Sequence, residues 1–265
     1  KKINLRLDLV TELIKDENLL FEIKDYLNKT SDIERIIGKI SSNKVNPPDL
    51  SNLSKSLTCL NSIGNLLSKK HKSVYKLLKN KKKLNSLIKT IDKTIVENPP
   101  VNINKGFFIK DKIDKTLDEY RAISKDANKW LLEYQEDQRE KTQISSLKIS
   151  FNKVFGYYID VTKTHLEKVP DYFIRKQTLT NSERYFTVEL KEYEDKILFS
   201  NDKCKEIENE IYLKLLKNIT LKFLEIQNNA RILSKLDVVC SHATAALNFN
   251  YCRPILDKKK NMELV

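Results

Sequence analysis

The segment "FNKVFGYYIDVTK" (Phe151–Lys163) is unlike the rest of this chain, because it gathers four aromatic residues, a glycine and several β-branched residues. Just before it, Leu147, Ile149 and Phe151 alternate with polar residues, and a period of two predicts a strand. Asn152–Gly156 predicts the turn, and "YYIDVT" predicts the returning strand. Downstream, "HLEKVPDYFIRKQTLTNSERYFT" predicts a loop and at least one more strand. The sequence therefore predicts one small sheet near the middle of the chain.

Two long amphipathic segments flank the predicted sheet, one over residues 111–142 and one from Glu189 to about Ala230. Either helix alone would expose its apolar stripe, so each needs a partner, and antiparallel pairing with the sheet at the far end is the simplest arrangement. Their polar faces mix both signs of charge, which disfavours membrane-surface helices. The first stripe comprises Ile113, Leu117, Tyr120, Ala127, Trp130, Leu131 and Tyr134, and the second Leu190, Tyr193, Ile197, Cys204, Ile207, Ile211 and Leu215.

Residues 1–98 predict a small helical bundle. A capping-box pattern of Ser31 and Glu34 places a helix start near Asp32. The first "NPP", at Asn46–Pro48, ends that helix, and the second, at Asn98–Pro100, opens a non-helical connection to about residue 110. We therefore expect a mainly α fold: a helical core, two long antiparallel helices, and a small β-rich insertion at their tip.

The composition excludes several classes of function. With only four glycines, no GxxxxGK[ST] or GxGxxG phosphate loop can be assembled. No Ser/His/acid or Cys/His grouping appears, and four scattered cysteines without a CxxC pattern favour neither zinc nor a disulfide framework. No apolar run reaches the length of a membrane span. We predict no catalytic, cofactor-binding or metal-binding residue in this chain, and no enzyme activity of its own.

The formal charge of +13 is concentrated in one place. The run "KKHKSVYKLLKNKKK" (Lys69–Lys83) holds eight lysines and no acid, more than half of that excess. Such a run is either a solvated helix face or a contact for a polyanion, and its charge alone does not separate the two.

Hydrogen-bond donors are concentrated in "RKQTLTNSER" (Arg175–Arg184). Side chains of these types bind phosphate oxygens and position a nucleic-acid duplex without reading its sequence. The alternative is a polar hairpin that only keeps the tip soluble. The donors of this segment include Arg175, Lys176, Gln177, Thr178, Thr180, Asn181 and Arg184.

Three long segments resemble the lever and clamp region of the MutS family of DNA mismatch repair proteins: "SLKISFNKVFGYYIDVTK", "YFIRKQTLTNSERYFTVELKEYEDKIL" and "LDVVCSHATAALNFNYCRP". Upstream, "DIERIIGKI…VNPPDL" and "LDEYRAISKDANKWLLEYQEDQREKT" resemble the family's helical core and ascending lever, in the same order. The resemblance covers residues 5 to 254. It implies that these seven donors of the Arg175–Arg184 segment, together with Lys153 in the Asn152–Gly156 turn, are the candidate DNA-binding residues. The family often has Lys where this chain has Thr180, whose hydroxyl can still donate to phosphate.

The resemblance implies four regions: 1–124, helical core and ascending lever; 125–190, clamp; 191–255, descending lever and return to the core; 256–265, the start of a link to an ATPase domain. It implies non-specific backbone contacts to double-stranded DNA, no membrane, and a second MutS-type subunit in a dimer. ATP and Mg would be cofactors of the absent domain, and the localisation would be cytoplasmic, with the nucleoid. Lys1 in place of Met indicates a piece of a longer protein.

Two other functions stay open at this point. A structural coiled-coil module could dock its tip onto a protein partner, which predicts a hydrophobic tip surface. A branch of the same family could instead act on recombination junctions, with the same lever and clamp. In either fold the aromatic residues of "VFGYYI", and Trp130, are expected to pack the sheet against the helices rather than to stack on bases.

Overall fold

The computed structural model describes residues 2–67, 71–152 and 154–256. The chain forms two compact units. Unit 1 comprises Lys1–Lys110 and Tyr212–Val265, and unit 2 comprises Asp111–Ile211. The domain bounds that the resemblance implied stay predictions, and residues 257–265 of the expected link lie outside the described residues.

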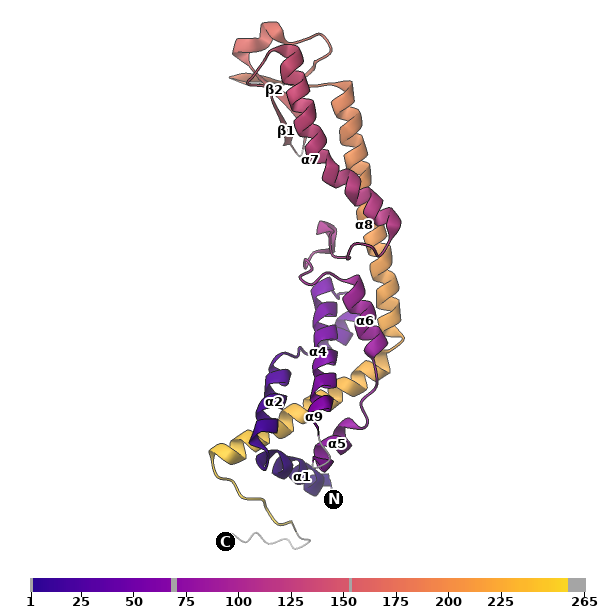
Figure 1. The fold of residues 1–265 in the computed structure, drawn as a ribbon, viewed down its shortest axis with the longest axis vertical. Coiled ribbons are helices and arrows are strands. Elements are labelled where there is room, and N and C mark those ends of the chain that lie inside the picture. Colours follow the sequence, from indigo (N-terminus) through magenta and orange to yellow (C-terminus); the bar gives the residue numbers. More distant parts are fainter. Residues whose placement is uncertain (1, 68–70, 153, 257–265) are drawn as a thin grey trace. The chain divides into compact units, whose positions relative to one another are not determined.

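Unit 1 is a helical bundle built around α9 and α4 (Figure 1). The helix α9 packs against α1, α2 and α3, and α4 packs against α2, α3 and α6. Leu13, Ile23, Leu50, Leu53 and Ile63 are each 0% exposed in this core. The elements are α1 (Lys2–Ile14), α2 (Glu17–Asn28), α3 (Ile33–Ser41), α4 (Pro47–Leu66), α5 (Lys72–Leu78), α6 (Asn85–Thr94), the 3-10 helix η1 (Ile103–Lys105) and α9 (Phe223–Asn248).

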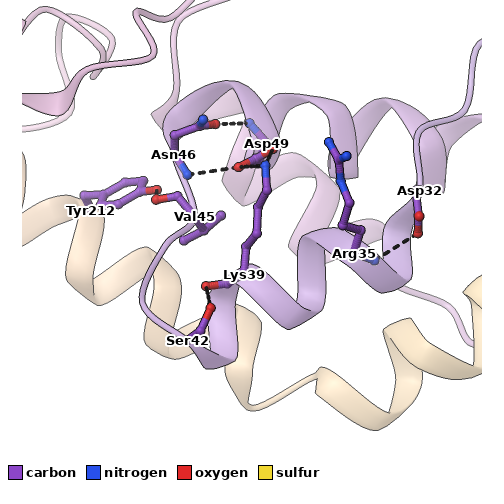
Figure 2. A network of polar contacts seen from close by, with 8 residues as sticks. All are labelled: Asp32, Arg35, Lys39, Ser42, Val45, Asn46, Asp49 and Tyr212. Carbon is purple, nitrogen blue, oxygen red and sulfur yellow. Dashed lines mark hydrogen bonds and ion pairs between the residues drawn. The ribbon is translucent and has the colours of Figure 1, made fainter.

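The first "NPP" begins α4 rather than ending the helix before it, because α3 already stops at Ser41 and Asn46 is the N-cap of α4. Figure 2 shows Asn46 and Asp49 in a reciprocal capping box: each side chain accepts a hydrogen bond from the other residue's backbone N–H. Lys39 of α3 donates to the same Asp49 carboxylate at 2.7 Å, and the Tyr212 hydroxyl donates to the Val45 carbonyl at 3.1 Å. The α3–α4 corner is therefore fixed from both sides.

The N-cap of α3 is Asp32, not Ser31. The Asp32 carboxylate accepts from the Arg35 N–H at 2.9 Å. Ser31 instead donates its own N–H to the Ser56 hydroxyl of α4. The prediction of Ser31 as the cap was therefore wrong by one residue. Serine and aspartate can both cap a helix, and the contact of Ser31 with α4 decides between them.

Unit 2 contains α7 (Lys115–Thr142) and the first part of α8 (Val188–Thr220), paired antiparallel as expected. Contacts between them pair early residues of one helix with late residues of the other. The Tyr134 and Thr187 hydroxyls are 2.6 Å apart, Ser124 donates to Asn201 at 2.8 Å, and the Arg121 guanidinium donates to the Glu208 carboxylate. Trp130 stacks between Tyr134 and Tyr193, with ring centroids at 4.7 and 3.6 Å, and so is a packing residue.

The second long helix ends earlier than the predicted Ala230. It stops at Thr220, and α9 begins at Phe223 after a two-residue turn. No proline or glycine marks this break. Ile219 and Ile226 are both 1% exposed and lie seven residues apart, so the helical spacing of apolar residues continues across the turn. The sequence pattern therefore gives no sign of the break between α8 and α9.

The sheet has four antiparallel strands in the order β1-β2-β4-β3. The predicted hairpin is confirmed: Phe151 pairs with Tyr157 and Asn152 with Gly156. The prediction of at least one more strand is also confirmed, because two strands follow, β3 and β4. The elements are β1 (Lys148–Asn152), β2 (Gly156–Thr162), the 3-10 helix η2 (Lys163–Lys168), β3 (Ile174–Thr178) and β4 (Ser182–Phe186).

One face of the sheet packs on the two helices. Ile159, Val161 and Tyr185 from the strands join Tyr134 of α7 and Leu190 of α8 in one buried cluster. The opposite face, called the outer face below, carries the alternate residues of each strand. The mainly α fold with a small sheet is thus the observed one, and the two segments that carried the prediction meet on one sheet.

Candidate nucleic-acid interface

The predicted donor segment forms the β3–β4 hairpin, and β3 is an edge strand of the sheet. Thr178 closes β3, Thr180 and Asn181 form the turn, and Ser182 opens β4. The Leu179 N–H donates to the Ser182 carbonyl at 2.9 Å, which closes the turn. The structure therefore brings seven of the eight candidate residues onto one hairpin. The eighth, Lys153, lies outside the described residues.

Arg184 and Gln177 lie together on the outer face. They are register partners, and the Arg184 guanidinium donates to the Gln177 side-chain oxygen at 2.8 Å. The same guanidinium lies 4.3 Å from the centroid of the Tyr158 ring, which is only 8% exposed. Arginine stacks well on aromatic faces, so Tyr158 and Gln177 together fix the orientation of Arg184.

Lys176 joins the two hairpins of the sheet. It lies between Arg175 and Gln177, where the β3–β4 register shifts. Its ammonium group donates to the Phe155 carbonyl in the β1–β2 turn, and it lies 5.3 Å from the Phe186 ring centroid. The bulge turns this side chain toward the neighbouring turn rather than along the strand.

Arg175 is the most open cation of the hairpin, with 66% of its side chain exposed. Its guanidinium lies 3.9 Å from the Glu183 carboxylate, a long ion pair that leaves most donors in solvent. Glu183 also accepts a 2.6 Å hydrogen bond from the Tyr185 hydroxyl. Burial, and then this bond and the nearby carboxylate charge, raise the pKa of Tyr185 to about 12.

The hairpin turn is open to solvent. Thr178, Thr180 and Asn181 are exposed, and within the described part of the chain no side-chain hydrogen bond engages them. The turn backbone is held in place, because the Lys163 N–H donates to the Asn181 carbonyl at 3.1 Å. Two hydroxyls and an amide are therefore presented on a fixed backbone.

The site includes two residues that sequence reasoning missed. Glu194 of α8 is 5% exposed, and its carboxylate accepts from the Tyr157 N–H at 2.8 Å and from the Lys191 ammonium at 2.8 Å. A side chain on Gly156, whose φ is +73°, would collide with that carboxylate. The glycine was visible in the sequence, whereas its dependence on Glu194 was not. Tyr158 was expected to pack the sheet against the helices, but it lies on the outer face under Arg184, because its neighbours Tyr157 and Ile159 face the helices.

The side chains that the hairpin presents are hydrogen-bond donors. Over residues 2–67, 71–152 and 154–256, no three His, Cys, Asp or Glu side chains gather as ligands for a metal ion. Within the same ranges, no helix is both long enough and apolar enough to cross a membrane. What the hairpin offers a ligand is N–H and O–H donors on a rigid sheet edge.

Comparison with known proteins agrees with this geometry. Residues 112–203, which span α7, the sheet and the start of α8, match the model described as MutS family domain IV. The DNA mismatch repair protein MutS of Methanosarcina mazei is 41% identical over 261 residues, which are 97% of this chain and 29% of that protein.

Two further relatives are also named DNA mismatch repair protein MutS. MutS of Halothermothrix orenii is 40% identical over 265 residues, 100% of this chain and 30% of that protein. MutS of Cytophaga hutchinsonii is 43% identical over 255 residues, 95% of this chain and 30% of that protein. The chain thus spans about 30% of the length of the curated relatives it matches. With identity at this level along nearly all of its residues, the chain belongs to the MutS family.

Proposed function

We propose that this chain contributes the DNA-holding part of a mismatch repair protein, and that the β3–β4 hairpin contacts the phosphate backbone of duplex DNA without reading sequence. The observation that carries this proposal is the exposed row of donors on the hairpin. Arg175, Thr178, Thr180 and Asn181 are solvent-exposed on a backbone that the sheet holds rigid. Donors of these types position a duplex through its phosphates.

The candidate residues divide into two roles in this proposal. The exposed four are the contacting groups. Lys176, Gln177 and Arg184 already donate or accept within the sheet, and they act as positioning residues that hold the hairpin in shape. Few cations touch the duplex, so we expect weak binding, with a slope of log K against log salt of only about 0.9 for each cation that contacts a phosphate.

In the longer protein, we propose that α7 and α8 relay motion between the DNA and an ATPase domain that binds ATP and Mg. A second MutS-type subunit would close around the duplex from the other side. This relay is supported by the pairing of α7 and α8, where an ion pair between Arg121 and Glu208 and the Trp130 stack hold one helix to the other. A stiff pair of helices transmits displacement better than a single helix that can bend.

The direct test is fluorescence anisotropy of a labelled duplex with the 265-residue chain at about 50 and 200 mM salt. Arg175→Gln with Asn181→Ala removes two proposed contacts. Since Arg175 is the charged one, we expect the slope of log K against log salt to become shallower by about 0.9. Lys129→Gln on α7, which removes an exposed lysine paired with Glu133, is the matched control and should leave the slope unchanged. A hairpin variant with the wild-type slope would contradict the proposal.

A second candidate function has one observation in its favour. Apolar side chains are exposed on β1, in the β1–β2 turn and on β3, with Phe151 at 52%, Val154 at 80% and Ile174 at 44%. A protein partner could dock there, as the coiled-coil alternative predicts. Val154→Asp separates the two functions: it should leave duplex binding intact and abolish a protein contact, whereas loss of duplex binding alone would assign this turn to the DNA. A four-way junction in place of the duplex tests the branch of the family that acts on recombination intermediates.

A further inference from the structure

A second basic surface lies in unit 1. The described part of the lysine run contains six lysines, here called the lysine segment. Five of its lysines are exposed, and Lys81 is half-buried. The segment spans α5 and the loop that leads toward α6, and it comprises Lys72, Lys76, Lys79, Lys81, Lys82 and Lys83.

The lysine segment lacks the ion pairs that lysines make elsewhere in this chain. On α7 and α8, exposed lysines pair with acids three or four residues away, as Lys129 does with Glu133 and Lys203 with Glu206. Among the described residues, no ion pair or side-chain hydrogen bond engages the six lysines of the segment. Unpaired like charges raise the local positive potential.

Two acids that contact the start of α5 are already engaged. The Glu12 carboxylate accepts from the Ser73 and Val74 N–H groups at 2.8 and 3.0 Å, which caps α5. Asp16 lies 3.1 Å from the His71 ring nitrogen. These acids of α1 and its C-terminal turn satisfy the start of α5 and leave the lysines beyond it uncompensated.

The loop is held rigidly despite its charge. Asn229 of α9 is 2% exposed; its side-chain oxygen accepts from the Lys82 N–H at 2.7 Å and its amide donates to the Lys82 carbonyl at 3.0 Å. The neighbouring Asn228 donates to the Asn80 carbonyl at 2.9 Å. A buried side chain that binds both backbone groups of one residue fixes the loop, so ordering it on binding costs little.

Like charges are also pressed together here. Burial, and then the nearby Lys83 ammonium, lower the pKa of Lys81. A polyanion would relieve this repulsion. Lysine is depleted in protein–protein interfaces, whereas lysines that neutralise phosphates supply most of non-specific nucleic-acid binding. Val74 and Leu78 of α5 are buried in the bundle and Leu77 is half-buried, so Tyr75, at 56% exposure, is the one large hydrophobic side chain that α5 exposes. That is too little apolar surface for a membrane-bound helix.

We propose that the lysine segment is a second DNA-binding surface, which contacts duplex phosphates independently of the β3–β4 hairpin. Its ligand is the phosphate backbone, and it reads no sequence. The surface adds to the affinity of the hairpin and increases the salt dependence of the whole chain.

The test measures binding of a labelled duplex by the 265-residue chain across a salt series. The loop variant Lys79→Gln/Lys82→Gln/Lys83→Gln should lower the salt slope by about 2–3, since each lost phosphate contact is worth about 0.9. The control Lys129→Gln/Lys203→Gln/Lys205→Gln removes the same charge from paired, exposed lysines and should leave the slope unchanged. Arginine at the same three loop positions keeps the charge and should retain the wild-type slope, which separates lost contacts from a misfolded loop.

A loop variant with the wild-type slope overturns the proposal, and so does a control that lowers the slope equally, because net charge alone would then explain the effect. Binding of the loop variant to DNA with the wild-type slope, together with lost binding to polyglutamate, would assign the segment to an acidic protein instead. The hairpin variant Arg175→Gln/Asn181→Ala keeps the two proposals apart. If the hairpin variant keeps the wild-type slope and the loop variant does not, the hairpin assignment fails and the lysine-segment proposal stands. If only the hairpin variant lowers the slope, the lysine-segment proposal fails and the hairpin assignment stands.

Discussion

The bundle of unit 1 and the α7–α8 pair of unit 2 bury different kinds of side chain. In the bundle, Leu50, Leu53 and Ile63 are completely buried among other apolar side chains. In the α7–α8 pair, Glu208 and Ser200 are each 1% exposed, although both are polar. Both regions are helical and both bury uncharged polar side chains, such as Ser56 and Asn229 in the bundle at 0% and 2% exposure. Among the described residues, however, the α7–α8 pair buries a carboxylate, Glu208, more deeply than the bundle buries any, since Asp49 is 8% exposed.

The number of packed helices explains this difference. Several helices can surround an apolar side chain on all sides, and burial then stabilises it by about 25 cal/mol for each Å² removed from water. Two helices enclose only a narrow seam. Stacked aromatic rings and matched polar groups fill that seam, such as Trp130 on Tyr193 and Arg121 on Glu208. The stability of the bundle therefore depends mainly on the apolar area that it buries, whereas that of the α7–α8 pair depends more on contacts between specific side chains.

The largest effect is expected from breaking the buried ion pair of unit 2. Arg121→Met leaves the Glu208 carboxylate buried without its cation, and such a loss costs about 4 kcal/mol. The single tryptophan of the chain, Trp130, lies in unit 2, so its fluorescence during urea unfolding monitors this region. Arg121→Met/Glu208→Leu removes both charges and should recover most of the loss. If the double variant is as unstable as the single one, the pair is not what holds the helices.

The bundle should respond to lost volume instead. Leu53→Ala empties space in the unit 1 core and should cost about 3 kcal/mol, followed by far-UV circular dichroism during urea unfolding. Leu132→Ala on α7 is the control, since Leu132 is 64% exposed and should change stability little. If Leu53→Ala and Leu132→Ala lost equal stability, the apolar area that a side chain buries would not explain the difference between the two regions.

A smaller effect is expected at the β1–β2 turn. Gly156→Ala places a side chain at positive φ against the Glu194 carboxylate, and the left-handed backbone alone costs about 1–2 kcal/mol. The matched substitution Gly38→Ala lies inside α3 with open space around it, and it should stabilise the bundle by about 0.5–1 kcal/mol. The midpoints of thermal unfolding of the two variants should therefore shift in opposite directions. A shift in the same direction would contradict the different roles given to Gly156 and Gly38.

The smallest effect concerns the buried phenol of the sheet. The folded pKa of Tyr185 is raised to about 12 from an ordinary value near 10, so its contribution to stability is complete below pH 10 and is lost between pH 10 and 12. In a pH titration followed by absorbance at the phenolate band, the Tyr185→Phe variant should show one fewer tyrosine ionising above pH 10 than the wild type does. That variant should also lose less stability than the wild type over the same pH range, and an unchanged titration would contradict the shift.

Much of the fold follows from local sequence signals. The alternation around Phe151 and the turn at Gly156 predicted a hairpin that is observed, because these features act over a few residues. The first "NPP" was read as the end of a helix, whereas its Asn46 caps the start of α4. The end of α8 at Thr220 was not predictable, since the apolar period runs through the break without interruption. The choice of Asp32 over Ser31 as a cap depended on Ser56, a residue of another helix.

The candidate site divides in the same way. The residue types of Arg175–Arg184 marked a donor-rich hairpin, but not which donors stay exposed. That Arg184 lies over Tyr158, and that Lys176 donates to Phe155, depends on strand order and on a shift of register between β3 and β4. Neither is encoded in spacing along the chain.

The sequence by itself determined the helices, the inserted sheet and the donor-rich and lysine-rich segments, because periodicity and residue chemistry are local properties. Only the tertiary structure decided which charges are neutralised. Lys129 and the lysines of α5 are alike as residues, yet Lys129 has an acid one turn away, whereas Glu12, which lies against α5, caps the backbone of that helix instead. Charge pairing depends on distances across the fold, and these are set by packing.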